Sequence, residues 1–402
     1  MDALAWLLVA LLAALAWARL AIRGLLTQFR VDRLRDQPAA EPAGGWPRLA
    51  VVAPCRDEAA GVEAAARSFL DQDYPGLEVL AVDDRSSDGT GEILDHLAAR
   101  HPGLRVRHVA ALPEGWLGKN HACQVGAAET AGEWILFADG DVVLGAHVLR
   151  RAVSYAEAHR LGHLVALPRF RAHGFLERAF VTGFAALANG VFRTWELRRP
   201  RTAGFIGVGA FNLVRRSEYE RVGGHLRLAL EVVDDAKLGL LLRRSGVRQG
   251  AVDSGGLVTV RWQAGLVRSL GGLVKNLFAG VEYSWPRALL GFLGLAFLSA
   301  APLAAALLAP APAARGVALY ALGTSVVVHG LVARQFGDGS GLEGLLFPLA
   351  GLAVAGLLIV SAAAATLRGG IVWRGTRYPI GSLRRGCLRA ADLPVAGAVG
   401  WE

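Results

Sequence analysis

One apolar stretch ending in acids constrains the fold of this chain most strongly. Residues 134–141 read Trp-Ile-Leu-Phe-Ala-Asp-Gly-Asp. A continuous apolar run of this kind is typical of a buried strand in a parallel sheet. Ligands of open α/β sheets bind at the carboxyl ends of strands, so Asp139 and Asp141 are expected beside a ligand. Two buried carboxylates favour a hard divalent cation that shares substrate phosphates. An acidic β-turn is the alternative, because Asp-Gly is also common turn chemistry.

Further acids follow two other predicted strands. The sequence pattern predicts strands at 48–54, 77–82 and 104–109 and helices at 59–70, 91–100, 122–130 and 146–159. Alternating strands and helices indicate an α/β fold with a mostly parallel sheet and right-handed crossovers. Asp57 and Glu58 follow the first strand, and Asp83 and Asp84 follow the second. All these acids are expected at one edge of the sheet, which favours a metal–nucleotide site over the β-turn.

Apolar segments gather at both ends of the chain. Of the 402 residues, 53% are hydrophobic, and the mean hydropathy is +0.37. Residues 3–18, 288–309, 316–333 and 345–367 are candidate membrane spans. Arginines follow the first segment instead of preceding it, which indicates an uncleaved anchor with a cytoplasmic flank; a buried soluble helix is the alternative. We therefore expect a multi-pass protein of the cell membrane with a cytoplasmic catalytic domain.

The number of spans and the charge of the tail disagree. Four spans would place the C-terminus outside, whereas the arginines after residue 367 favour the cytoplasm, so one segment is expected to be re-entrant or interfacial. The net charge of +9 comes largely from arginines beside apolar segments, which fits an anionic membrane surface and not nucleic acid. Residues 169–200 have the composition of an interfacial helix or of a core helix. The three cysteines show no disulfide or zinc spacing.

Four acidic motifs together resemble those of family-2 glycosyltransferases, which are inverting enzymes with the GT-A fold. The motifs are Pro54-x-x-Asp57-Glu58, the Val82–Thr90 run Val-Asp-Asp-x-Ser-x-Asp-Gly-Thr, Asp139-x-Asp141 and Asp234-Asp235. The resemblance covers about residues 49–278 and the membrane layout. It implies that Pro54, Asp57 and Glu58 line the nucleotide pocket. It also implies that Asp83 and Asp84 bind the uracil–ribose part of the donor.

The resemblance implies roles for the later acids as well. Asp139 and Asp141 would hold Mg²⁺ or Mn²⁺ against the donor diphosphate, and Asp235 would be the general base. A metal on the diphosphate assists departure of the leaving group, and one carboxylate can remove the proton of the acceptor hydroxyl. Lys119 is a candidate contact to the diphosphate; a solvated loop lysine is the alternative. The implied partners are a nucleotide-sugar donor, a lipid acceptor and the membrane.

Two features bear on the acceptor. Membrane members of the family usually carry Gln/Arg-x-x-Arg-Trp after the base; here Arg261-Trp262 is present, but Val258 stands at the first position. This departure disfavours a polysaccharide synthase, which stays an alternative. Residues 373–378, Trp-Arg-Gly-Thr-Arg-Tyr, resemble a tail common in the hopanoid, carotenoid and ceramide glycosyltransferase group. A non-catalytic nucleotide-sugar-binding membrane protein is a further alternative, whose mark would be lost acids.

The sequence thus predicts six consecutive parts. They are an N-terminal transmembrane anchor (1–28), a basic linker (29–46), a GT-A domain (47–262), an interfacial amphipathic segment (263–286), about three C-terminal transmembrane helices (287–368) and a basic tail (369–402).

Overall fold

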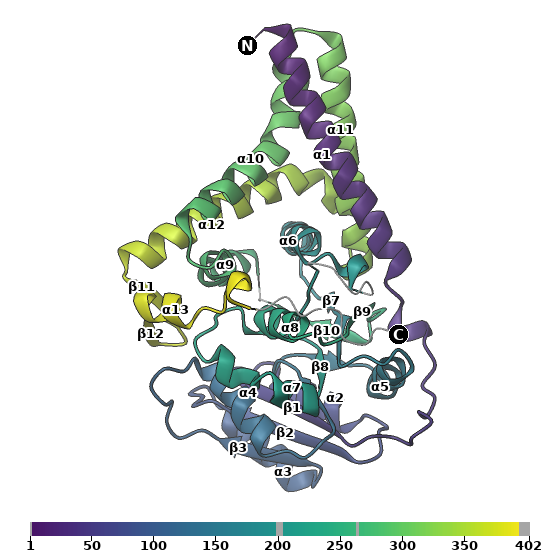
Figure 1. Cartoon of the computed structure of the whole chain (residues 1–402), viewed down its shortest axis with the longest axis vertical. Helices are drawn as coiled ribbons and strands as arrows, with labels where there is room; N and C mark the ends of the chain where they lie inside the picture. The colour runs from purple at the N-terminus through teal and green to yellow at the C-terminus, as the bar shows by residue number, and fades with distance from the viewer. Residues whose placement is uncertain (1, 198–203, 263–264, 394–402) are drawn as a thin grey trace. The chain divides into compact units, whose positions relative to one another are not determined.

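The computed structural model describes residues 2–197, 204–262 and 265–393 (Figure 1). Small parts of the predicted interfacial segments and the end of the predicted basic tail lie outside these residues. The chain divides into two compact units. The helical unit comprises Met1–Arg30, Phe170–Trp195 and Trp262–Arg384, and the sheet unit comprises Val31–Arg169, Glu196–Arg261 and Arg385–Glu402. Neither unit is continuous in sequence, unlike the predicted domains.

A seven-stranded sheet forms the centre of the sheet unit, within the described residues. Its order is β3-β2-β1-β4-β8-β6-β9. The strands are β1 (Leu49–Cys55), β2 (Leu77–Asp83), β3 (Leu104–His108), β4 (Trp134–Phe137), β6 (His163–Leu167), β8 (Asn212–Arg215) and β9 (Gln249–Asp253). β1 pairs in parallel with β2 and β4, whereas β8 is antiparallel to β4 and β6. The predicted mostly parallel sheet is confirmed, with β8 as the described strand that runs in reverse.

Burial explains why the central strands are apolar throughout. All four residues of β4 are buried, and so are the first five residues of β1. Helices flank this sheet in the sheet unit: α2 (Val62–Leu70), α3 (Thr90–Arg100), α4 (Gly118–Ala128), α5 (Val148–Ala158), α7 (Arg216–Arg221) and α8 (Asp234–Arg244). At Gly126 of α4 an added Cβ would lie 2.2 Å from Cγ1 of Val52. Glycine therefore allows α4 to approach β1 closely.

Two helices carry site residues in their first turns, and one of them begins earlier than the sequence predicts. α4 begins at Gly118, four residues before the predicted start, so Lys119 lies in its first turn. α8 begins at Asp234 and includes Asp235 in its first turn. A short ribbon, β5 (Val143–Leu144) paired antiparallel with β10 (Val258–Val260), also lies in the sheet unit.

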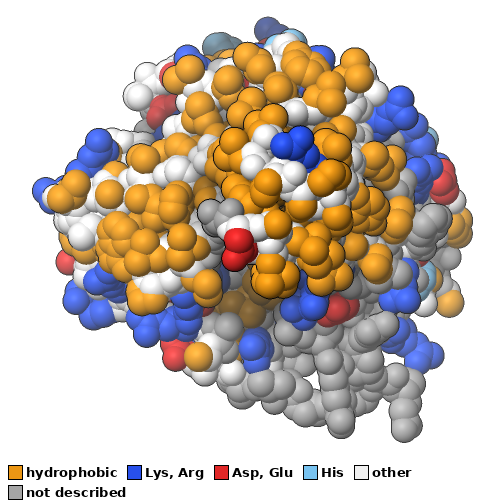
Figure 2. Space-filling view, turned by 90° about the horizontal axis from the view of Figure 1, so that it is seen from above, with side chains coloured by type: hydrophobic (Ala, Val, Ile, Leu, Met, Phe, Trp, Pro, Cys, Tyr) orange, Lys and Arg blue, Asp and Glu red, His pale blue; other side chains and the backbone are white. Residues whose placement is uncertain are grey.

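Long apolar helices dominate the helical unit. It contains α1 (Ala3–Arg30), α6 (Phe175–Phe192), α9 (Leu266–Gly280), α10 (Trp285–Leu308), α11 (Pro312–Phe336) and α12 (Phe347–Leu367). Among the described residues, four helices are long and apolar enough to cross a membrane: Ala3–Leu25, Trp285–Leu308, Pro312–Phe336 and Leu342–Leu367. Figure 2 shows apolar side chains covering much of one face. Leu290 and Leu307 are 72% and 75% exposed, as expected of side chains that face lipid.

α6 belongs to the helical unit although the predicted GT-A domain includes its residues. Its Arg178 forms an ion pair of 3.0 Å with the fully buried Glu343. Its Phe184 stacks on Trp262, with ring centroids 5.2 Å apart and planes at 10°. The helix thus packs within this unit, and the Trp262 ring of the Arg-Trp pair is used in that packing.

The predicted tail motif forms a β-hairpin. β11 (Gly370–Trp373) pairs antiparallel with β12 (Thr376–Pro379), and α13 (Ile380–Gly386) follows. The ammonium group of Lys275 lies 4.1 Å from the centroid of the Trp373 ring, a cation–π distance. The hairpin is therefore held against α9 within the helical unit.

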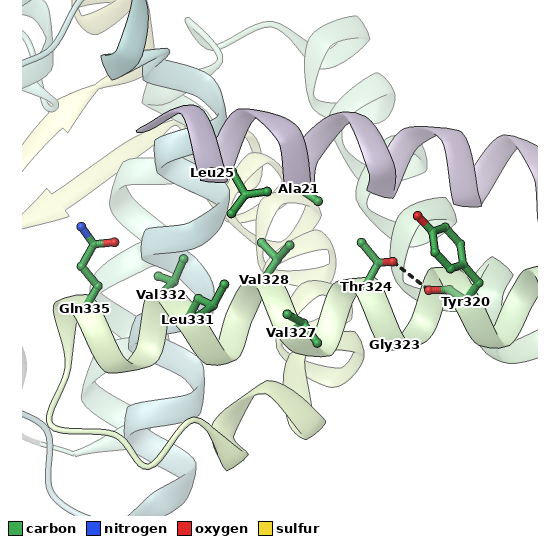
Figure 3. Close-up of a pocket in the computed structure, with 11 residues that line it drawn as sticks. Ala21, Leu25, Tyr320, Gly323, Thr324, Val327, Val328, Leu331, Val332 and Gln335 are labelled. Carbon is green, nitrogen blue, oxygen red and sulfur yellow. Dashed lines mark hydrogen bonds between the residues drawn. The ribbon is translucent and has the colours of Figure 1, made fainter. Parts of the chain in front are cut away.

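A groove of about 400 Å³ lies between α1 and α11 (Figure 3). Aliphatic side chains such as Leu25 and Val328 line its length. The Thr324 hydroxyl donates to the backbone carbonyl of Tyr320 at 2.9 Å, so the helix itself satisfies this polar group. Most of the lining is aliphatic, as expected between two helices suited to a bilayer.

Candidate active site

The carboxyl ends of three parallel strands meet at one edge of the sheet. Cys55, the last residue of β1, pairs in register with Asp83 of β2, and the Asp84 N–H donates to the Cys55 carbonyl at 2.8 Å. On the other side of β1, Val52 pairs with Phe137 of β4. The acids that follow β1, β2 and β4 therefore converge, as the strand pattern predicts.

The loops after β1 and β2 are joined by hydrogen bonds. Asp57 has a positive φ of 53°, a conformation uncommon for a residue other than glycine. Its carboxylate accepts the Ser87 N–H at 2.8 Å, and its own N–H donates to the Ser86 hydroxyl at 3.1 Å. The Glu58 N–H donates to the Thr90 hydroxyl at 2.8 Å. The two loops predicted to hold the nucleotide thus form one connected surface.

Asp83 and Asp84 are buried, and each is held by groups that the motifs do not indicate. Asp83 lies 2.9 Å from Nδ1 of His108, and the hydrogen bond to Asp83 raises the pKa of His108. Asp84 pairs with Arg85 at 2.8 Å and with Arg56 at 3.3 Å. These partners fix both carboxylates in place. Arg56 and Arg85 could have been found from the sequence, because they stand at variable positions inside the acidic motifs.

The acids after β1 and β4 create a crowded negative region around Cys55. Burial raises the pKa of the Cys55 thiol, and the neighbouring carboxylates of Glu58, Asp83, Asp141 and Asp139 raise it further. Burial also raises the pKa of Asp141 to about 7, with Asp139 and Glu58 as the next causes. The region therefore has a negative potential that its own residues do not fully compensate.

This arrangement fits a divalent cation that is only partly held by protein. No group of three His, Cys, Asp or Glu side chains suited to a metal occurs among the residues that the structure describes. Asp139 and Asp141 supply two carboxylates, and Mg²⁺ is commonly bound by one or two carboxylates together with substrate phosphates and water. The residues present thus suit a cation that arrives with a diphosphate.

Lys119 joins the metal motif to the helix that carries the predicted base. Its ammonium group lies 2.8 Å from Oδ1 of Asp139 and 3.5 Å from Oδ2 of Asp234. Burial lowers the pKa of Lys119, but the three carboxylates of Asp139, Asp234 and Asp235 outweigh burial and raise it well above its usual value. The lysine is thus a charged member of the site. It lies on a helix and is paired with carboxylates, so it is not a solvated loop lysine.

Gly209 connects Asp139 with Asp235. Its N–H donates to Oδ2 of Asp235 at 2.7 Å, and its carbonyl accepts the Asp139 N–H at 3.0 Å. A Cβ at Gly209 would lie 2.5 Å from Oδ2 of Asp139 and 3.1 Å from Nζ of Lys119. The predicted metal and base residues, 96 positions apart, therefore lie in one site. The only sequence signal for Gly209 is a glycine-rich segment without a recognised fingerprint.

Replacing Gly209 by alanine is expected to displace the Asp139 carboxylate, because the new methyl group has no room beside it. We expect kcat to fall by about 10²-fold, the typical cost of a shift of about 1 Å in a catalytic site. Steady-state kinetics of the sugar transfer that the family resemblance implies would measure this. Gly44→Ala is the matched control, since nothing lies within 4 Å of a Cβ at Gly44. Equal activity of both variants would contradict the close-approach role.

The raised pKa of Asp141 predicts a pH-dependent stability in metal-free protein. Between about pH 4 and pH 7 the folded chain holds this proton and the unfolded chain does not, so the free energy of unfolding falls as pH rises through that window. The full shift corresponds to about 4 kcal/mol. Asp141→Asn removes the titration, so its Tm in EDTA should fall less than that of the wild type between pH 4.5 and 7.5. Identical slopes would contradict the prediction.

Comparison with known proteins agrees with this geometry. Residues 50–223 match the family described as glycosyl transferase family 2. A 4,4'-diaponeurosporenoate glycosyltransferase of Staphylococcus haemolyticus is 26% identical over 245 residues, which are 59% of this chain and 63% of the relative. A beta-monoglucosyldiacylglycerol synthase of Synechocystis is 30% identical over 161 residues, 40% of this chain and 33% of the relative. The chain thus matches less than two thirds of the length of either relative.

A solved structure shares the fold. The mannosyltransferase PcManGT from Pyrobaculum calidifontis, in complex with GDP-Man and Mn²⁺, superposes with a TM-score of 0.53 and 21% identity, covering 90% of this chain and 99% of that chain. At this identity the likeness concerns the fold alone. This likeness of fold is consistent with the family match of residues 50–223 and with the sheet topology described above. Residues 50–223 match glycosyl transferase family 2, and the chain has the GT-A fold.

Proposed function

We propose that this chain transfers a hexose from a nucleotide-sugar, most simply a UDP-sugar, to a hydroxyl group of a membrane lipid, with inversion at the anomeric carbon and with Mg²⁺ or Mn²⁺. One observation carries the proposal: Gly209 binds Asp235 through its N–H and Asp139 through its carbonyl, so the proposed base and a proposed cation ligand share one partner. The family membership of residues 50–223 supports the transfer of a glycosyl group.

Asp235 is the proposed general base. Its two oxygens accept the N–H groups of Gly209 and Ala236, at 2.7 and 2.8 Å, which orients the carboxylate. A carboxylate oxygen has more than one acceptor site, so Asp235 can still accept the proton of an acceptor hydroxyl. The hydroxyl oxygen then bonds to the anomeric carbon as the nucleoside diphosphate leaves from the opposite face. This single displacement inverts the configuration and needs no protein nucleophile.

The other charged residues are proposed to hold the donor. Asp139 and Asp141 would hold the cation, which when bound neutralises charge on the departing diphosphate. Lys119, already charged beside Asp139, would contact the diphosphate. Pro54, Asp57 and Glu58 would line the nucleotide pocket, while Asp83 and Asp84 would bind the uracil–ribose part of the donor.

A lipid acceptor is supported by features of both the chain and its relatives. Four described helices are long and apolar enough to span a membrane. The name of one relative, beta-monoglucosyldiacylglycerol synthase, denotes a glycolipid product. We propose that the protein lies in the cell membrane with the sheet unit in the cytoplasm, because arginines follow the first apolar segment in the sequence.

Incubating membranes that contain the protein with labelled UDP-sugar and MnCl₂ tests the proposal. Label is expected in the lipid extract, with Asp235→Asn membranes as the control. Label in a lipase-insensitive product of high molecular weight would point instead to a polysaccharide synthase. Donor binding without any labelled product, with lipid supply shown to be adequate, would favour the non-catalytic alternative.

A further inference from the structure

The chain returns to the sheet unit after its last apolar helix. Residues 386–393, which we call the C-terminal strap, follow α13, and Leu388 and Leu393 of the strap are buried in one apolar cluster with Leu238 and Leu241 of α8. A Cβ at Gly386 would lie 2.7 Å from Cβ of Leu230. The strap therefore packs closely against the segment that leads into α8 and against α8 itself.

Two buried charged side chains bind the backbone of one strap residue. The Leu388 N–H donates to the carboxylate of Glu231, and the Leu388 carbonyl accepts from the ammonium group of Lys237. Glu231 and Lys237 are only 1% and 5% exposed. Glu231 precedes Asp235 by four residues and Lys237 follows it by two. The strap is thus held at two points, one on each side of the proposed base.

The charge on these two side chains makes the attachment specific. Burying a carboxylate or an ammonium group costs free energy unless the group is hydrogen-bonded. Loss of the hydrogen bond to the strap is therefore unfavourable for both Glu231 and Lys237. Hydrogen bonds with one ionised partner are also stronger than neutral ones. Apolar packing alone would explain the buried leucines, but it would not call for buried charges aimed at backbone groups.

The same segment is also bound by α4. Asn120 is fully buried, and its side-chain N–H group donates to the carbonyls of Leu228 and Glu231, the latter at 2.9 Å. The residues before Asp235 are consequently bound by both α4 and the strap. Only the strap comes from the distant C-terminal part of the chain, 157 positions after Glu231.

We propose that the C-terminal strap is a positioning element for the general base, which sets the place of Asp235 through Glu231 and Lys237. This inference rests on the proposed function for the role of Asp235. The attachment of the strap to Glu231 and Lys237 does not depend on that function. The strap contacts no part of the predicted donor site among the described contacts. It should therefore affect the rate of the chemical step and leave donor binding unchanged.

A matched pair of variants at Leu388 tests the attachment of the C-terminal strap in the full-length protein. Leu388→Pro removes both the N–H donor and the leucine side chain, whereas Leu388→Ala removes only the side chain. We expect kcat of Leu388→Pro to be about 10-fold to 100-fold below that of Leu388→Ala, the range expected for a base displaced by up to about 1 Å. The Kd of the UDP-sugar with Mn²⁺ should agree within about twofold. Arg389→Ala, at an exposed neighbour, is the control for the strap surface.

A second pair tests the same bond from the other partner. Glu231→Gln keeps an oxygen that accepts the Leu388 N–H, whereas Glu231→Leu has none. We expect Glu231→Gln to have a higher kcat than Glu231→Leu. The two variants should have equal donor Kd values and equal folded fractions. If the two members of each pair have the same kcat, or if donor binding falls in parallel with kcat, the strap serves folding alone and the proposal is overturned.

Hydrogen exchange separates this proposal from the proposed function. Backbone amides in residues 228–240 should exchange faster in Leu388→Pro than in Leu388→Ala, whatever reaction the protein performs. If exchange is faster in Leu388→Pro and the wild type makes no labelled lipid, the strap is kept and the lipid transfer is rejected. If the two variants exchange equally and the wild type makes labelled lipid, the strap is rejected and the transfer is kept.

Discussion

Asp235→Asn is expected to abolish most hexose transfer while the donor remains bound. Loss of a general base typically costs about 10²–10⁴-fold in rate, and we expect a fall in kcat within this range. Asparagine is nearly isosteric and keeps an oxygen for the Gly209 N–H, which Asp235 now accepts at 2.7 Å. The side chain can therefore keep its bond to Gly209 without its basicity, although it no longer accepts the Ala236 N–H. The Kd of UDP-sugar with Mn²⁺, measured by titration calorimetry, should change less than about threefold.

The control for Asp235 is its neighbour Asp234. Asp234 is 4% exposed and lies 3.5 Å from Lys119, so its carboxylate is directed at the lysine. Asp234→Asn should weaken donor binding through Lys119 more than it lowers kcat. If Asp235→Asn instead lost donor binding and kcat equally, Asp235 would belong to the donor site and the assignment of the base would be wrong.

Asp141→Asn is expected to weaken metal-dependent donor binding. Residues that only support a metal ligand typically contribute 10-fold to 100-fold in metal affinity, so loss of one of two carboxylates should cost at least about 100-fold. Asp141 is the better of the two to replace, because Lys119 already neutralises part of Asp139. Titration of Mn²⁺ with and without UDP-sugar measures the effect.

The response to added Mn²⁺ distinguishes Asp141→Asn from Asp235→Asn. Saturating Mn²⁺ should restore donor binding to Asp141→Asn, because the remaining acids and the diphosphate still supply oxygens. It should not restore kcat to Asp235→Asn. Identical donor Kd values for wild type and Asp141→Asn at low Mn²⁺ would show that the cation is held elsewhere.

Much of the site could be predicted because its signals are local. The strand Trp134–Phe137 and the acids that follow it are adjacent in sequence, and the same holds for Cys55 with Asp57 and for Val82 with Asp83. Hydrophobic runs identify buried strands, and parallel strands bring their carboxyl ends to one edge. The convergence of these acids followed from that rule alone.

The partners of these acids could not be predicted in the same way. His108 binds Asp83, and Gly209 binds both Asp139 and Asp235, but none of these pairs is close in sequence. The reversed direction of β8 also depends on its pairing with β4 and β6. Long-range pairing is set by how whole elements pack, and periodicity within one segment does not report it.

The sequence by itself determined the apolar helices, the mostly parallel α/β sheet and the row of acids, because each depends on hydrophobicity and residue order within a short stretch. Only the tertiary structure decided that α6 belongs to the helical unit, that Gly209 joins Asp139 to Asp235, and that the C-terminal strap binds beside the base. Such contacts form between residues far apart along the chain. Their hydrogen bonds and close approaches exist only once the folded backbone brings the partners together.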